Sequence, residues 1–149
     1  MSIKPIEAWK FPLYISADAG ATWILVDGVE TMSHTHSDTT VSTNAFSNNG
    51  KETFLKTADT ESYKYAGHGY YDTITGVKDA GQALCETYSL NMGTSAELLC
   101  RVDTPSATVT KKFTAIPSVN SASGGVKEAS KWEVTLKVTG QTVIIARPA

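Results

Sequence analysis

The sequence lacks the features that mark proteins which span membranes or coat nucleic acid. No apolar run approaches the roughly 20 residues that a membrane helix needs. The net charge is only −2, so the chain as a whole does not attract nucleic acid or an anionic membrane surface. The beginning of the chain has neither a continuous apolar segment nor a small-residue cleavage site, and we expect no signal peptide there.

Catalytic motifs are also missing. The serines fall in predicted turns, and there is no G-x-S-x-G elbow to present one as a nucleophile. The glycine pairs lack the Lys-Ser/Thr ending and the following helix of a phosphate-binding loop. The glutamates are scattered and give no acid–base pair. The sequence therefore predicts a protein that is not an enzyme and has no cofactor.

Cysteine is scarce, with only Cys85 and Cys100 in the chain. The first lies at the edge of a predicted helix face, and the second lies on the apolar face of the following predicted strand. A disulfide between them is one alternative. Since no secretion signal is present, we expect two reduced thiols in the core.

Residues 76–90, GVKDAGQALCETYSL, have the periodicity of a helix. Polar side chains fall on one side of this stretch, as an amphipathic surface helix requires. Thr75 or Gly76 is expected to cap it, and Asp79 lies in the first turn, where the helix dipole favours a carboxylate. We expect its apolar face to pack on the core through Val77, Ala80, Leu84 and Tyr88.

After this helix, apolar and polar residues alternate with a period of two. The clearest case is 131–138, where Trp132, Val134 and Leu136 alternate with charged and hydroxyl side chains. Such alternation indicates antiparallel strands with one buried and one solvated face. We predict a mainly β fold, an antiparallel β-sandwich or partly open barrel flanked by one α-helix. The length suits a single domain, 1–149, with an N-terminal arm at 1–10.

Residues 36–58 break this pattern. The stretch is polar and turn-prone around Asn49-Gly50. Its apolar residues are few: Val41, Phe46, Phe54 and Leu55. A segment of about twenty residues without a core of its own is uncommon inside a compact domain, and such segments are usually functional or mobile. We predict an extended polar loop here.

A candidate metal site lies at His34, His36 and Asp38. Two histidines that are two residues apart on a strand point the same way and can share a metal ion. The pattern resembles the HxHxD box of the metallo-β-lactamase superfamily, but this chain has Thr39 where that box continues with another histidine. We therefore expect no metal site, and a small metal-dependent hydrolase remains an alternative.

A group of tyrosines offers another alternative. Tyr63, Tyr65, Tyr70 and Tyr71 lie around Lys64 and can form a surface on which a base or a sugar stacks. A monomeric β-sandwich that binds carbohydrate or mediates adhesion would use such a surface. Packing in a core or an interface is the simpler explanation for the same residues.

The order of these elements resembles the major tail tube proteins of long, non-contractile-tailed bacteriophages. The resemblance covers nearly the whole chain from about Val26 on. It is carried by the order and spacing of four short motifs: Asp27-Gly28-Val29, Tyr65-Ala66-Gly67-His68, Asp79 with Gln82, and Ser123-Gly124-Gly125 followed by Trp132-Glu133-Val134-Thr135-Leu136 and Gly140.

The resemblance implies a structural virion protein. Copies of the chain would form hexameric rings that stack into a tail tube. The tube would be assembled in the host cytoplasm, and DNA would only pass through its lumen in transit. A tape measure protein and a tail terminator would be further partners, and no membrane would be involved. The loop at 36–58 would reach a neighbouring subunit or ring, through Val41, Phe46, Asn48, Asn49, Gly50, Lys51, Glu52, Phe54 and Leu55. We expect that loop to be mobile in a free subunit.

Overall fold

One antiparallel sheet organises the fold. This computed structural model describes residues 3–105 and 108–148. The sheet has seven strands in the order β2-β1-β5-β6-β7-β4-β3. The elements, with three short 3-10 turns (η), are η1 Ala8–Lys10, β1 Leu13–Ser16, β2 Ile24–Leu25, β3 Val29–Ser42, η2 Phe46–Asn48, β4 Phe54–His68, α1 Ala80–Ser89, η3 Gly93–Ala96, β5 Leu98–Asp103, β6 Val109–Asn120 and β7 Lys131–Ala146.

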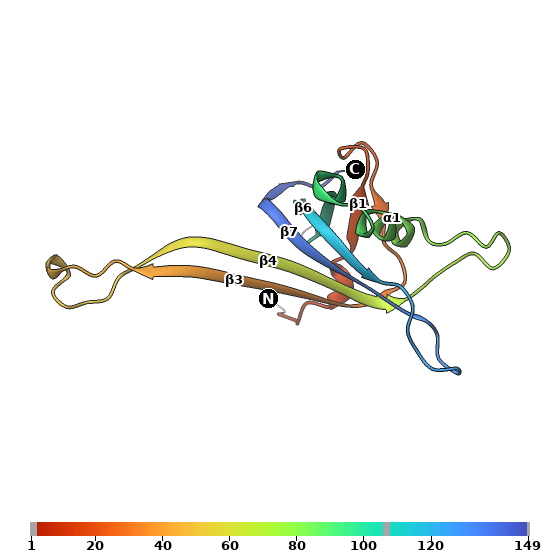
Figure 1. Cartoon of the computed structure of the whole chain (residues 1–149), viewed down its shortest axis with the longest axis horizontal. Coiled ribbons are helices and arrows are strands. Elements are labelled where there is room, and N and C mark those ends of the chain that lie inside the picture. Colours follow the sequence, from red (N-terminus) through yellow and green to blue (C-terminus); the bar gives the residue numbers. More distant parts are fainter. Residues whose placement is uncertain (1–2, 106–107, 149) are drawn as a thin grey trace.

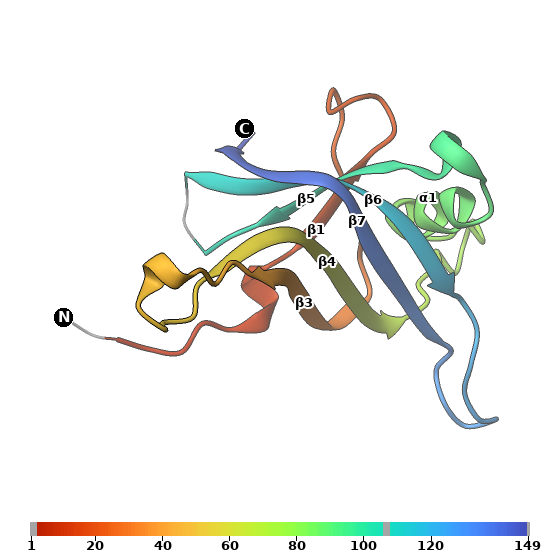
Figure 2. The same cartoon turned by 60° about the vertical axis from the view of Figure 1, so that its left-hand side comes forward.

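The sheet is bent and open, and it does not close into a barrel. Its long strands β6 and β7 change direction along their length, as Figure 2 shows. A register shift between Lys112 and Thr114 marks the bend on β6. The predicted mainly β fold with a flanking helix is confirmed. β7 runs through Gly140, which has a φ of 80°, without ending there.

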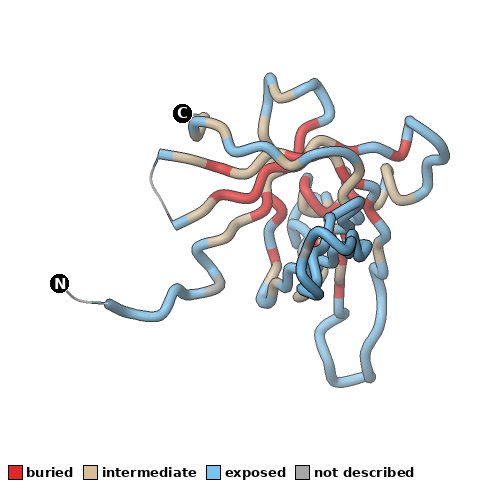
Figure 3. Tube along the Cα trace, turned by 90° about the vertical axis from the view of Figure 1, so that its left-hand side faces the viewer, coloured by how far each residue is buried: buried red, intermediate tan, exposed pale blue. Residues whose placement is uncertain are grey.

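The core lies on one face of the sheet. The alternation on β7 is confirmed, since Trp132, Val134 and Leu136 are buried while Lys131 and Thr135 are exposed. Figure 3 shows the buried segments gathered at the centre of the molecule. The buried apolar side chains are Leu13, Ile15, Val26, Tyr63, Tyr65, Cys85, Leu98, Cys100, Val102, Phe113, Ala115, Trp132, Val134 and Leu136.

Both cysteines are buried and free, as expected. Burial raises the pKa of the Cys85 thiol to about 12, and it raises the pKa of Cys100 as well. The thiolate form is therefore suppressed at neutral pH, and these side chains act as small apolar groups in the core. No helix in the two described ranges is long and apolar enough to cross a membrane.

Helix α1 begins later than the sequence predicts, and its buried face is rotated from the predicted one. Its N-cap is Asp79, whose side chain accepts a hydrogen bond from the Gln82 backbone at 3.1 Å. Val77 precedes the helix and is 65% exposed, and Ala80 is also exposed, so neither belongs to the predicted core face. Leu84 and Tyr88 are half-buried and do pack against the core. The fully buried helix residues are Gly81, Gln82 and Cys85.

Gln82 ties the helix to two strands. Its amide nitrogen donates to the carbonyl oxygens of Asp27 and His68, each at 2.8 Å, and its amide oxygen accepts from the Tyr70 backbone at 3.0 Å. These bonds satisfy backbone groups just before β3 and at the end of β4. Gln82 is therefore a buried polar residue on the side of α1 that the sequence periodicity assigns to solvent.

The predicted polar loop at 36–58 is mostly strand. β3 continues to Ser42 and β4 begins at Phe54, so only 43–53 connects the two strands. The pairing runs from Val29 opposite Gly67 to Ser42 opposite Phe54. The sequence conceals these strands because both faces of the hairpin are exposed beyond the sheet, and the alternation that reveals a strand arises from one buried face. Figure 1 shows the hairpin protruding far from the body.

Replacing Gln82 with leucine is expected to destabilise the fold. The substitution keeps the volume but removes hydrogen bonds to three backbone groups, at a cost of about 3 kcal/mol. The melting temperature should fall by roughly 6–12 °C, as measured by circular dichroism. Thr87→Ala on the exposed side of the same helix should change it by less than about 2 °C. Equal melting temperatures for the two variants would contradict the role assigned to Gln82.

Gly67 is expected to be irreplaceable for a steric reason. A Cβ built there would lie 2.0 Å from the backbone oxygen of Gly28, so β3 and β4 would have to separate at their junction with the body. Gly67→Ala should cost about 2 kcal/mol or more. Gly69→Ala is the matched control, because a Cβ there meets nothing within 4 Å. Urea denaturation of both variants checks this, and a neutral Gly67→Ala would show that the strands do not approach so closely.

Candidate assembly interface

The hairpin beyond the sheet is the main candidate for a functional surface. We call residues 36–61, from His36 on β3 to Glu61 on β4, the arm. β4 pairs with β7 only from Ser62 onward, so within the described strands the arm is a two-stranded ribbon. A two-stranded ribbon is at best marginally stable in water without further packing. The arm therefore lacks the third layer or strand that would fix it.

The end of the arm is apolar and uncovered. The arm tip consists of Val41, Phe46, Phe54 and Leu55, which are 46%, 106%, 63% and 56% exposed. Leu55 pairs with Val41 across the strands, so apolar groups are concentrated at one end of an otherwise polar ribbon. A cluster of this kind, bordered by polar residues, is typical of a surface that contacts another molecule.

The turn at the end of the arm has a defined geometry. The Thr43 backbone donates to Thr53 at 2.9 Å, and the Thr53 backbone donates to the side chain of Asn44 at 2.9 Å. Asn49 and Gly50 have left-handed φ angles of 54° and 73°, which reverses the chain. The predicted loop residues Lys51 and Glu52 are exposed here, while the side chain of Asn48 lies outside what the structure describes.

The base of the arm is anchored to the core by aromatic stacking and by one carboxylate. His34 stacks on Tyr63 at 4.4 Å, and Tyr63 stacks on Phe113 at 4.7 Å between ring centroids. Glu61 accepts hydrogen bonds from Thr142 on β7 at 2.9 Å and from Tyr63 at 3.1 Å, and it pairs with His34 at 2.7 Å. Partial burial raises the pKa of Glu61, but these hydrogen bonds together hold it below its ordinary value.

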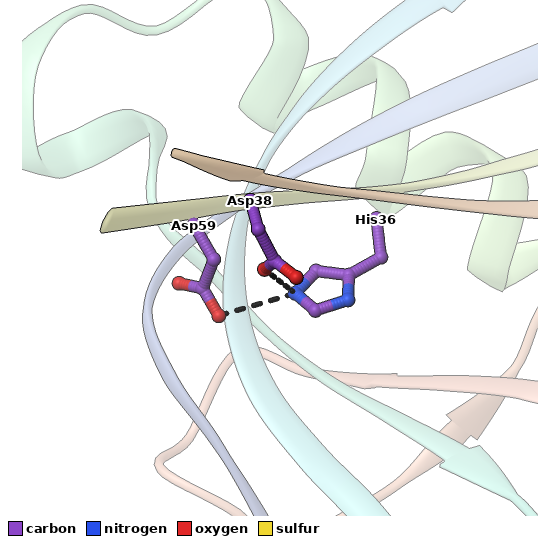
Figure 4. A group of neighbouring side chains, drawn as sticks. All are labelled: His36, Asp38 and Asp59. Carbon is purple, nitrogen blue, oxygen red and sulfur yellow. Dashed lines mark hydrogen bonds and ion pairs between the residues drawn. The ribbon is translucent and has the colours of Figure 1, made fainter. Parts of the chain in front are cut away.

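A charged cluster follows just beyond this anchor. His36 Nε2 lies 3.3 Å from Asp38 Oδ1 and 3.1 Å from Asp59 Oδ2. Figure 4 shows both carboxylates beside the imidazole ring of His36. Lys56 Nζ lies 2.8 Å and 3.4 Å from the same two carboxylate oxygens. Hydrogen bonds from His36 and Lys56 lower the pKa of Asp59, and the bond to Asp38 raises the pKa of Lys56.

The structure groups these residues differently from the sequence prediction. His34 and His36 do point the same way, but His34 is held by Glu61, while His36 and Asp38 meet Asp59. Sequence reasoning missed Asp59 because it lies on the partner strand, and only the register places it opposite Asp38. The sequence alone does not reveal that the carboxylates of Asp38 and Asp59 face each other, because this depends on the pairing register of the two strands.

The tyrosines do not form a binding platform. Tyr63 and Tyr65 are each 2% exposed and belong to the core, where the Tyr65 hydroxyl donates to the Phe11 carbonyl at 2.9 Å. Tyr70 and Tyr71 are exposed but lie outside the regular part of β4. The four predicted tyrosines therefore do not share one surface, and of these four Tyr70 and Tyr71 alone are exposed.

The outer edge of β3 is a second candidate surface. β3 ends the sheet, so its 14 residues have a ladder partner on one side only. The N-terminal arm covers its beginning, where Trp9, Phe11 and Met32 line a groove of about 180 Å³. Beyond Met32 the edge is exposed. Proteins avoid leaving such long edges free, because another strand can pair with them.

The anchor at Glu61 is expected to make stability depend on acidity. Its pKa is lower in the fold than the ordinary 4.5, so its contribution is complete above about pH 4.5 and is lost as the pH falls below that value. The melting temperature of the native chain should therefore fall more steeply between pH 5 and 3 than that of Glu61→Gln. If the melting temperatures of the two proteins fall equally steeply with pH, Glu61 has the same pKa in the folded and the unfolded state.

Comparison with solved structures shows what this fold is similar to. A chain of the virion of a native gene transfer agent particle is 12% identical, with a TM-score of 0.72 over 95% of this chain and 100% of that one. A chain of the tail of an empty gene transfer agent particle, with C6 symmetry, is 14% identical, with a TM-score of 0.70 over 95% and 100%. A chain of the SPP1 tail tube is 17% identical, with a TM-score of 0.70 over 96% and 80%.

The likeness lies in the fold rather than in the sequence. Neither a family profile nor a curated protein matches this chain. The likeness nevertheless extends over nearly the whole chain, including the sheet, the flanking helix and the protruding hairpin. This chain has the phage tail tube protein fold.

Proposed function

We propose that the chain is a structural subunit of a phage-type tail tube, in which copies close into six-membered rings and the rings stack. The observation that carries this proposal is the arm, a two-stranded ribbon with an exposed apolar tip. The C6 symmetry of a tail with the same fold supports the number of subunits in a ring. The proposed role is structural and not enzymatic.

The arm is incomplete by itself, and a neighbouring subunit would complete it. Fully burying a side chain the size of Phe or Leu stabilises a contact by about 1.5–3 kcal/mol. Burying Phe46, Phe54 and Leu55 together would therefore offset much of the cost of ordering the turn at 43–53, which is on the order of 1 kcal/mol per residue. We place this contact between rings, and we assign it to the predicted loop residues from Val41 to Leu55.

The free edge of β3 would account for ring closure. A strand edge that pairs with a different edge of a second copy gives a head-to-tail interface, and such an interface makes a ring when the rotation between copies closes. The edge beyond Met32 is exposed and continuous to Ser42, so it can pair with a strand of a neighbour. In this arrangement the ring would satisfy the backbone groups that the isolated chain leaves to water.

The proposal extends to the other partners that the resemblance implies. A tape measure protein would occupy the growing tube, a terminator would close its end, and DNA would pass through without a dedicated binding site. The near-neutral charge of the chain agrees with a surface that does not hold DNA tightly. The location would be the virion tail.

Removing the apolar tip is expected to prevent stacking without unfolding the chain. In the variant Phe46→Ser/Phe54→Ser/Leu55→Ser, the core is untouched, because these side chains are exposed. Negative-stain microscopy should show tubes for the native chain and only rings or single subunits for the variant. Circular dichroism should show the same melting temperature within about 3 °C.

The control variant Phe46→Leu/Phe54→Leu keeps the tip apolar and should still form tubes. Normal tubes from the triple serine variant would remove the arm tip from the interface. A native chain that stays monomeric at all concentrations, and in the presence of a preformed tube end, would overturn the proposed function as a whole.

A further inference from the structure

The charged cluster on the arm has the geometry of a metal-binding group. The ligand atoms of His36, Asp38 and Asp59 all lie within 4.8 Å of one another. The histidine nitrogen is 3.3 Å and 3.1 Å from the two carboxylate oxygens. Ions of the zinc class bind nitrogen and oxygen at about 2.0–2.2 Å, so ligand atoms around one ion lie roughly 3.0–3.5 Å apart. The two separations from the histidine nitrogen already match this requirement.

The two strands hold these ligands in place before any ion binds. His36 and Asp38 are two residues apart on β3 and share a face, and Asp59 is the direct cross-strand partner of Asp38. Two carboxylates placed opposite each other repel, which destabilises an antiparallel pair unless a cation lies between them. The arrangement is therefore one that a bound cation relieves.

A cation already occupies the space between these carboxylates. Lys56 Nζ contacts Asp38 Oδ1 at 2.8 Å and Asp59 Oδ2 at 3.4 Å. A register shift between Thr39 and Thr40 brings Lys56 to this side of the ribbon. The ammonium group marks the position of positive charge independently of the histidine, and it competes with any ion that enters.

We propose that His36, Asp38 and Asp59 form a binding site for a divalent transition-metal ion of the zinc class, which joins β3 to β4 where the arm leaves the body. One imidazole with two carboxylates suits zinc and its neighbours, whereas calcium and magnesium prefer oxygen ligands alone. The cluster borders a polar cleft of about 570 Å³, lined also by Glu61, Gln141 and Thr142, that leaves room for water to complete the coordination.

This site would stiffen the arm from outside the core. A bound ion adds a cross-link between the strands at a point where β7 no longer supports β4. Entry of the ion must displace the Lys56 ammonium, so the native affinity is limited by this side chain. His34 takes no part, because Glu61 and Tyr63 hold it. The site is independent of whether the chain forms tubes.

Calorimetric titration of zinc chloride into the full-length native protein at pH 7 tests the proposal. We expect one equivalent to bind. His36→Ala and Asp59→Asn should each weaken binding at least tenfold, and Lys56→Met should strengthen it severalfold. His68→Gln is the matched control, because His68 pairs with Glu30 and lies outside the cluster. Its affinity should equal that of the native chain.

Histidine side-chain NMR gives a second readout on the unaltered protein. On addition of zinc, the ring signals of His36 should move, and those of His34 and His68 should not. Binding that survives His36→Ala, weakens equally in His68→Gln, or shifts all three histidines alike would overturn the site, as would no binding by the native or the Lys56→Met protein.

Discussion

A two-stranded ribbon that leaves its sheet has no way to bury itself, and the rest of this structure depends on that constraint. The arm pairs only with itself from Glu61 toward its tip, and its backbone hydrogen bonds are exposed to water on both faces. The body supplies an anchor at one end, through the stack of His34, Tyr63 and Phe113. Nothing in the described part of the chain covers the other end. The fold is thus stable at the base of the arm and incomplete at its tip, and a second copy is the simplest completion.

The sequence predicts the parts of the fold that have one buried face. The strict alternation at 131–138 identifies β7, because this strand buries alternate side chains against the core. The same logic fails on the arm, where neither face is buried and hydroxyl side chains occupy successive positions of β3. It also fails on α1. There Gln82 is polar but buried, since its bonds to backbone groups of other elements are visible only in three dimensions.

The candidate interface and the charged cluster were only partly accessible from the sequence. The four apolar residues in a polar stretch identified the arm tip, although as a loop, because isolated apolar residues stand out whatever their secondary structure. His36 and Asp38 were visible as neighbours on one strand. Asp59 was not, because its position opposite Asp38 depends on hairpin register and on the length of the connecting turn. Exposed polar residues on a two-stranded ribbon produce no periodic pattern in the sequence that would reveal their pairing.

The central claim is that the arm depends on a neighbouring subunit for its stability, and hydrogen exchange of the arm amides tests it most directly. The amides of residues 54–61 would be followed in dispersed subunits and in assembled tubes, with those of 132–136 on β7 as an internal reference for the core. The account predicts exchange on the arm that is much faster than in the core for dispersed subunits and nearly as slow as in the core within tubes. Slow exchange across the arm in dispersed subunits, or exchange that assembly leaves unchanged, would contradict it.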